Sequence, residues 1–296
     1  MEAVSDNKNK NKIKRQGGVV AKIIFGIFGT FFALYSLSMI LPILWAILTA
    51  LKSQSEYELN SPFALPEQWL FSNFAEAFRE LNVHNTNMFG MIANSLWYSA
   101  GCSLLHVLFA SMVAYIFARY PFKGSGIAYS VILIIMLLPI IGSLPSQYRM
   151  FKKLGLCDSP LFLLAQTSGI GFNFIVMHGF YKNLSWSYAE AAFIDGANLA
   201  TVFFRVMLPQ SLGMFVALVV IEFIGLWNDY STPMIFFPNM PTLALGLYEY
   251  EQEMIRGINM PVYFSGLIIS MLPVLIIFGF FQNTIMQSVS VGGLKG

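Results

Sequence analysis

The segment EAAFIDGANLATVFFRVMLP, from Glu190 to Pro209, stands between two apolar stretches that are each long enough to cross a membrane. It carries both acidic and basic residues and a run of small side chains. Gly196 can adopt the left-handed conformation that ends a helix, and Asn198 is a favourable N-cap for another helix. The segment therefore predicts a short helix, a sharp stop and a second helix between two membrane spans.

The first of these two helices is predicted to begin at Ser187, because Ser187 and Glu190 have the spacing of a capping box. The second is predicted from Leu199 to Met207, leading to Pro209 at the start of the next span. The first helix also carries small residues that give it a surface thin enough to enter a groove, namely Ala191, Ala192, Gly196 and Ala197.

The composition predicts an all-α, polytopic membrane protein. Of 296 residues, 56% are hydrophobic and only 11% charged, with a mean hydropathy of +0.65, whereas a soluble domain carries about 25% charged residues. Apolar runs of about 20 residues predict six spans: 19–50, 89–118, 126–147, 160–181, 210–235 and 261–285. The first apolar run is longer than the core of a signal peptide, so we expect it to be retained. In the fourth predicted span, Gly169 and Gly171 are expected to allow close helix approach.

The placement of lysine and arginine predicts that both termini lie in the cytoplasm. In this orientation, eleven of the 17 Lys and Arg residues fall in inner segments and six in outer ones, with QYRMFKKLG as the basic outer exception. Residues 1–18 form a basic cytoplasmic tail, and residues 19–296 form the transmembrane domain. The loop 182–209 is then cytoplasmic, and the segments 52–88 and 236–260 are the long outer ones.

The sequence contains no motif that would hold a nucleotide phosphate, since no stretch matches G-x-x-x-x-G-K-[ST]. It has no cysteine–histidine pattern typical of a metal site, and we expect no cofactor in this chain. We find no candidate catalytic residue, so the chain is not predicted to be an enzyme. If the protein drives uphill transport, its ATP and Mg²⁺ chemistry must come from another chain.

The opening segment resembles the EAA loop of ABC importer permeases, E-A-A-x-x-x-G followed by x-L-P. In that family the first helix of the loop is the coupling helix, which docks into a cleft of a cytoplasmic ATPase. The resemblance assigns this role to Glu190, Ala191, Ala192, Asp195, Gly196 and Ala197. The alternative interpretation is an amphipathic connector without a docking role.

Further segments are similar to the carbohydrate (oligosaccharide) type of these permeases, such as the smaller membrane subunit of maltose transporters. They are NSLWYSAG from Asn94, AYIFARYPFKG from Ala114, LWNDYSTPMIFF around Trp227, and the terminal VGGLKG. The chain departs from the family pattern at Ala189, where many relatives have a second glutamate, and at Ser185, where many have proline. These two departures bear on the details of pairing with the ATPase.

The resemblance implies a type I ABC importer permease fold in the cell membrane of a prokaryote. The implied partners are a second homologous permease subunit, two ABC ATPase subunits, an extracytoplasmic solute-binding protein and an oligosaccharide substrate, with no nucleic acid. The outer segment 236–260 is expected to contact the binding protein through Tyr248, Glu249 and Tyr250.

Polar and aromatic side chains in the spans are candidates for the substrate path. A charge at mid-bilayer costs about 2.5–3.5 kcal/mol on insertion scales, so Glu222 must face a cavity, pair with a polar group or be protonated. Its candidate partners are Gln166, Asn173 and Asn94. The path residues that we consider are Asn94, Asn173, Glu222, Trp227, Asn228, Asp229 and Tyr230, each with an alternative role in helix packing, capping or an interfacial aromatic belt.

Three alternative functions remain to be weighed. An ABC permease for another small organic solute, such as a polyamine, amino acid or phosphate ester, differs only in substrate, and the WNDY and VGGLKG segments favour sugars over it. A membrane-embedded transferase would need paired acids, a metal site or a nucleophile near the interface, which we do not find. A passive channel leaves the EAA segment without a purpose.

Overall fold

A computed structural model describes residues 2–138, 142–252 and 257–293, so Pro139, Arg256 and Lys295 lie outside the described part. The chain divides into two compact units, residues 1–71 and 72–296. Among the residues that the structure describes, the secondary structure is helical apart from one hairpin of two short strands, β1 (Asn82–Val83) and β2 (Thr86–Asn87). This agrees with the predicted all-α class.

The first unit consists of α1 (Glu2–Ala50), α2 (Gln54–Leu59) and the loop after α2. Ser53 caps α2 in a capping box with Glu56, whose Oε2 accepts a 2.7 Å bond from the Ser53 amide. The other Glu56 carboxylate oxygen accepts a 2.7 Å bond from the Glu67 amide, which ties the loop back to α2. The hydrogen bond from the Ser53 amide, followed by those from the loop, lowers the pKa of Glu56.

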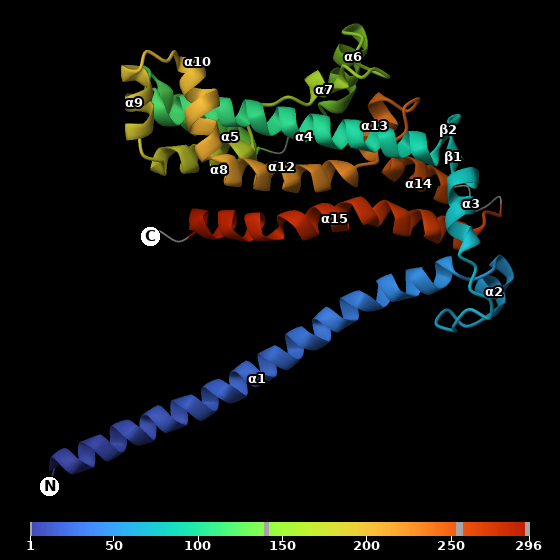
Figure 1. Cartoon of the computed structure of the whole chain (residues 1–296), viewed down its shortest axis with the longest axis horizontal. Helices are drawn as coiled ribbons and strands as arrows, with labels where there is room; N and C mark the ends of the chain where they lie inside the picture. The colour runs from blue at the N-terminus through green and yellow to red at the C-terminus, as the bar shows by residue number, and fades with distance from the viewer. Residues whose placement is uncertain (1, 139–141, 253–256, 294–296) are drawn as a thin grey trace. The chain divides into compact units, whose positions relative to one another are not determined.

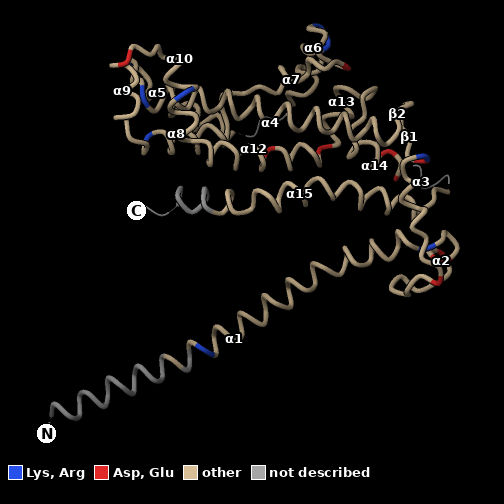
Figure 2. Tube along the Cα trace, viewed as in Figure 1, with Lys and Arg blue, Asp and Glu red and all other residues tan. Residues whose placement is uncertain are grey.

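The second unit is built around α4 (Met88–Arg119), which packs against α8 (Phe172–Asn183) and α12 (Leu212–Trp227). Helix α12 in turn packs against α15 (Met260–Gly293) (Figure 1). Figure 2 shows charged positions near α8, α9 and α10 and, at the opposite end, near α3 and α14, whereas α4 and the described part of α15 are tan along most of their length. The long helices therefore present apolar surface between two more polar ends.

Shorter elements occupy the two ends of this bundle. One end carries α3, the hairpin and α14, and the opposite end carries α9 and α10 (Figure 1). The bounds of the remaining elements are α3 (Ser72–Glu80), α5 (Ser125–Leu137), α6 (Leu144–Lys153), α7 (Phe162–Ala165), α9 (Ser187–Ile194), α10 (Leu199–Val202), a π-helical turn (Phe203–Met207), α11 (Leu208–Gln210), α13 (Ser231–Phe236) and α14 (Leu243–Gln252).

Among the described residues, three helices are long and apolar enough to cross a membrane: Ala21–Ala50, Met88–Arg119 and Met260–Met286. These match the first, second and sixth predicted spans. Leu199–Gln210 and Leu212–Trp227, bent by 79°, qualify as a fourth if they form one span. The third predicted span contains the 13-residue α5, and the fourth is divided into α7 and α8.

The core of the second unit is densely aromatic and contains one buried chain of hydroxyl groups. Tyr181 Oη lies 2.8 Å from Ser111 Oγ and 3.0 Å from Ser211 Oγ, and thereby joins α8 to α4 and to the N-terminus of α12. Gly169 lies against α4 so closely that an added Cβ would be 2.6 Å from Val113 Cγ2. The predicted close approach is confirmed at Gly169 and is wrong at Gly171, where an added Cβ would meet nothing within 4 Å.

Candidate functional site

The EAA segment folds as helix, stop and helix, as predicted. Gly196 has φ +82°, and its amide donates to the Phe193 carbonyl at 3.0 Å. The Ala197 amide donates to the Ala192 carbonyl, also at 3.0 Å. This pair of bonds is a Schellman motif, which requires a left-handed residue and so favours glycine. Asn198 then caps α10 by accepting a 2.8 Å bond from the Thr201 amide.

Two local predictions for this segment need correction. Trp186, not Ser187, stands at the N-cap of α9, and no side chain caps the helix there. Ser187 Oγ instead lies 2.7 Å from Ser185 Oγ, so the predicted capping box with Glu190 does not form. The second helix does not end at Met207, because the π-helical turn leads directly into α11, which contains Pro209.

The start of α9 is anchored to the end of α4 by Arg119. One guanidinium nitrogen of Arg119 donates a hydrogen bond to the Leu184 carbonyl. The guanidinium carbon lies 5.5 Å from the centre of the Trp186 ring, a cation–π distance. Tyr120 packs edge-on against the same indole, with ring centres 5.8 Å apart. Ala189 is fully buried beneath this cluster, so one face of α9 is fixed to the bundle.

The opposite face of α9 is exposed, and its apolar side chains lie among polar and acidic ones. Ile194 is 85% exposed and Tyr188 is 54% exposed, and both lie on this face with Ala191. Of the residues assigned to ATPase coupling, Glu190, Asp195 and Gly196 are exposed too, whereas Ala192 and Ala197 pack partly against the core. A helix held firmly on one side and bare on the other is suited to dock into a partner.

Glu222 pairs with side chains of two other helices. Its Oε1 lies 2.9 Å from His106 Nδ1 on α4, and its Oε2 accepts a 3.2 Å bond from the Asn173 amide on α8. Asn173, a partner named from the sequence, is therefore confirmed, and Asn94 instead donates to the Pro241 carbonyl at 3.0 Å. The His106 and Glu222 side chains are 22% and 28% exposed, so the cluster is enclosed but still accessible.

Asp229 organises the turn after α12. One carboxylate oxygen accepts bonds from the Ser231 and Thr232 amides at 3.0 and 3.1 Å, and the other accepts a 2.9 Å bond from Tyr98 Oη on α4. Together with the Asn94 bond, this contact joins the N-terminal part of α4 to the segment between α12 and α14. Both carboxylate oxygens of Asp229 therefore accept hydrogen bonds that hold this turn in place.

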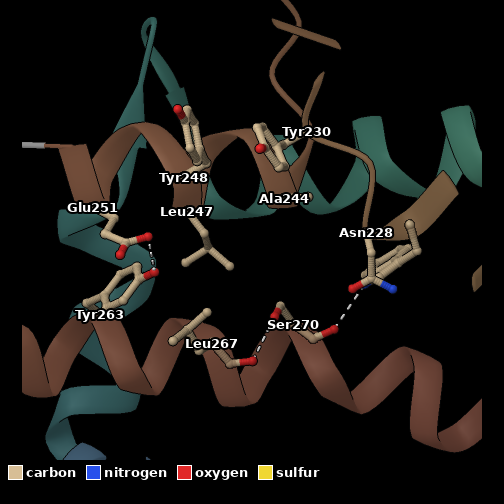
Figure 3. Close-up of a pocket in the computed structure, with 10 residues that line it drawn as sticks. Asn228, Tyr230, Ala244, Leu247, Tyr248, Glu251, Tyr263, Leu267 and Ser270 are labelled. Carbon is tan, nitrogen blue, oxygen red and sulfur yellow. Dashed lines mark hydrogen bonds between the residues drawn. The ribbon is translucent and has the colours of Figure 1, made fainter. Parts of the chain in front are cut away.

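Three of the predicted path residues, Trp227, Asn228 and Tyr230, line one cavity together with Tyr248 of α14 (Figure 3). Leu247, Glu251 and residues of α15 complete the lining. Two further residues expected to contact a binding protein have partners of their own. Glu249 lies 3.4 Å from His84 Nε2 of the hairpin turn, and the Tyr250 ring stacks on Tyr263 with centres 6.2 Å apart.

Sequence reasoning missed the contributions of His106, Arg119 and Trp186. His106 was one of three scattered histidines, and it meets Glu222 only because α4 packs against α12. Arg119 was noted inside the AYIFARYPFKG segment, but nothing in that segment connects it to residue 184. An arginine at the end of an apolar span, together with an aromatic residue at the start of a loop helix, is the signal that was available.

Comparison with known proteins places the chain in a transporter family. Residues 106–291, more than half of the chain, match the family described as the binding-protein-dependent transport system inner membrane component. A crystal structure of a bacterial ABC transporter that imports the acidic polysaccharide alginate contains a chain with the same fold. The TM-score is 0.73 at 21% identity, over 88% of this chain and 96% of that chain.

Two curated relatives match along most of their length. A diacetylchitobiose uptake system permease of Streptomyces coelicolor is 29% identical over 266 residues, 88% of this chain and 86% of the relative. An arabinooligosaccharides transport system permease of Bacillus subtilis is 30% identical over 278 residues, 90% of this chain and 94% of the relative. The chain belongs to the family of binding-protein-dependent transport system inner membrane components.

Proposed function

We propose that this chain is a permease subunit of an ATP-driven importer of oligosaccharides in the cell membrane of a prokaryote. It forms the translocation path with a second homologous permease, and it receives the sugar from an extracytoplasmic binding protein. Two separate ATPase subunits hydrolyse ATP, and this chain catalyses no reaction. The uptake of diacetylchitobiose and arabinooligosaccharides by systems containing relatives of this chain supports the assignment.

The observation that carries the proposal is the exposed apolar face of α9. Ile194, Tyr188 and Ala191 lie bare on a helix whose other face is anchored through Arg119. A membrane protein that leaves such a face exposed at a polar end of its bundle needs a soluble partner to cover it. We assign this partner as the ATPase, and α9 as the coupling helix.

The proposed topology has six spans and both termini in the cytoplasm. The basic tail 1–18 and the loop 182–209 lie inside, and the segments 52–88 and 236–260 lie outside. The inner end of the second unit is then the one that carries α9, and the outer end carries the cavity lined by Trp227 and Tyr248. Glu249 and Tyr250 lie at the same outer end, where the binding protein docks.

The proposed mechanism is mechanical. ATP binding closes the ATPase dimer and draws the two coupling helices together, which turns the bundle from inward-open to outward-open. A ligand shifts such an equilibrium only through its different affinities for the two states. Movement of the ATPase must therefore reach the spans through a stiff connection, and the Schellman turn together with the Arg119 anchor provides one.

The test is copurification of the ATPase with the tagged permease pair. Ile194→Ser removes the most exposed apolar side chain from α9, and we expect the ATPase to be lost from the purified complex. Phe122→Ser is the matched control, because Phe122 is also an exposed apolar residue but lies in the turn between α4 and α5. Full retention of the ATPase by the Ile194 variant would refute the assignment of α9.

A further inference from the structure

The cavity at the outer end of the second unit has a volume of about 210 Å³. Helix α14 forms one side, α15 forms the facing side, and the turn after α12 closes one end (Figure 3). Pockets for drug-sized ligands have volumes of roughly 300–1,000 Å³. This cavity therefore suits a single ring rather than a whole oligosaccharide.

One wall of the cavity is an aromatic pair. The rings of Tyr230 and Tyr248 stack with centres 4.3 Å apart and planes inclined by 18°. They come from two separate elements, and Tyr230 is 41% exposed, so the pair is not enclosed in the core. Leu267 lies on the facing side, which adds an apolar surface opposite the rings (Figure 3).

The two ends of the cavity are polar. Glu251 lies at one end, where its Oε2 accepts a 3.1 Å bond from Tyr263 Oη. Asn228 lies at the other end, where its amide nitrogen donates to the Ile224 carbonyl at 2.8 Å. The second carboxylate oxygen of Glu251 and the amide oxygen of Asn228 have no hydrogen-bond partner among the described residues. Both are acceptors, so the ends call for hydroxyl donors.

This pattern of walls and ends matches the chemistry of a sugar ring. A pyranose presents C–H groups on its faces, which pack on aromatic and aliphatic surfaces, and hydroxyl donors around its edge. The carboxylate of Glu251 would repel an acidic ring. We propose that this cavity is a subsite for one neutral pyranose ring of the transported saccharide, held between the Tyr230–Tyr248 pair and α15.

This proposal rests on the proposed function. It adds a binding site for the sugar and a preference for neutral over acidic rings. The subsite lies at the outer mouth, so a ring released by the binding protein would meet it before entering the spans. The prediction is specific, because a neutral saccharide should occupy the cavity and a uronate of similar size should not.

The experiment measures protection of a cysteine in the cavity. In the complete complex in nanodiscs, with Cys157→Ser as background, Ala244→Cys is labelled with a small maleimide. The probes are diacetylchitobiose, maltotriose and raffinose, which all contain neutral pyranose rings, with an alginate trisaccharide as the acidic comparison and the binding protein omitted. We expect at least one neutral probe to slow labelling about fivefold or more, and the acidic probe to have no effect.

Substitutions in the aromatic wall and at the Glu251 end of the cavity identify which side chains bind the sugar. Tyr248→Leu and Glu251→Gln should each weaken protection about 5- to 10-fold in half-saturating concentration, whereas Tyr248→Phe keeps the ring and should retain it. Glu80→Gln, an exposed acid of α3, is the matched control for the loss of charge. Copurification of the partner permease and the ATPase with each variant shows that the complex has assembled.

The outcomes distinguish a failure of the proposed subsite from a failure of the proposed function. Transport of a saccharide by the complex without any protection at Ala244→Cys would overturn the subsite and leave the function standing. Protection by neutral sugars in a complex that transports none would support the subsite and overturn the proposed function. Equal protection by the acidic probe would also overturn the subsite.

Discussion

Replacement of Gly196 tests whether the turn after α9 transmits force. The glycine has φ +82°, and an added Cβ would meet nothing within 4 Å. Within this chain, a substitution at Gly196 is therefore disfavoured by the backbone conformation alone. A left-handed conformation costs an ordinary residue about 1–2 kcal/mol. That corresponds to a factor of about 5–30 in the ratio of intact to broken turn. Asparagine tolerates this conformation better than alanine, and valine tolerates it worst.

The assay is the stimulation of ATP hydrolysis by sugar-loaded binding protein in the reconstituted complex. We expect Gly196→Asn to retain most of the stimulation, Gly196→Ala to reduce the stimulation about 5- to 30-fold, and Gly196→Val to abolish it. All three variants should still insert into the membrane. Gly179→Ala is the matched control, because Gly179 lies inside α8 without a positive φ and with equally open space. Equal stimulation in the Gly196→Ala and Gly179→Ala variants, or normal stimulation with valine, would refute the reasoning.

Three other changes test the remaining contacts. His106→Leu and Glu222→Leu should each lower the free energy of unfolding by about 1–3 kcal/mol, and the double variant should lose less than the sum of the two single losses. Additive shifts of the melting temperature would contradict the pairing. Arg119→Ala should speed hydrogen exchange in α9 and reduce stimulated ATP hydrolysis, unlike the exposed control Lys123→Ala; unchanged exchange would count against the anchor. Because the folded-state pKa of Glu56 is lowered, its stabilisation is present above the unfolded value near 4.3 and is lost as the pH falls through the folded pKa. The protection of the amides of residues 53–68, measured relative to their intrinsic exchange rate at each pH, should therefore fall on acidification, and Glu56→Gln should remove that pH dependence.

Local signals predicted the segment that contains α9 and α10 well. A left-handed glycine and an N-cap asparagine act through bonds that reach only a few residues, so Gly196 and Asn198 could be interpreted from the sequence alone. The capping box failed at Ser187 because Trp186 is drawn against Arg119 and Tyr120, which are distant in sequence. Tertiary packing decided the start of this helix and overrode the local pattern.

The fourth predicted span shows what hydropathy alone does not reveal, namely where a helix is interrupted. Residues 160–181 are apolar enough for a span, but the helix is interrupted between α7 and α8. Ser168 Oγ donates to the Ile170 carbonyl at 2.8 Å and accepts from its amide at 3.2 Å, which offers the backbone an alternative to helical bonds. Gly169 adds about 1 kcal/mol against a helix relative to alanine.

The candidate outer site could be predicted only in part, since its residues come from three separate elements. The WNDY segment drew attention to Trp227, Asn228 and Tyr230, and aromatic content drew attention to Tyr248. Glu251 carried no signal, because a glutamate near the end of a loop helix is ordinary. Its position at the cavity follows from how α14 packs on α15, which no local pattern encodes.

Helix α4 connects these two ends, and its contacts make it the stiff element that the mechanism requires. A helix of 32 residues is about 48 Å long at 1.5 Å per residue. At one end Arg119 holds α9, and at the other Asn94 and Tyr98 hold the segment that carries the outer cavity. A tilt imposed on α9 must therefore move the cavity wall as well. If so, Arg119→Ala also abolishes any nucleotide-dependent change in the labelling of Ala244→Cys, and an unchanged response in that variant would mean that the movement takes another route.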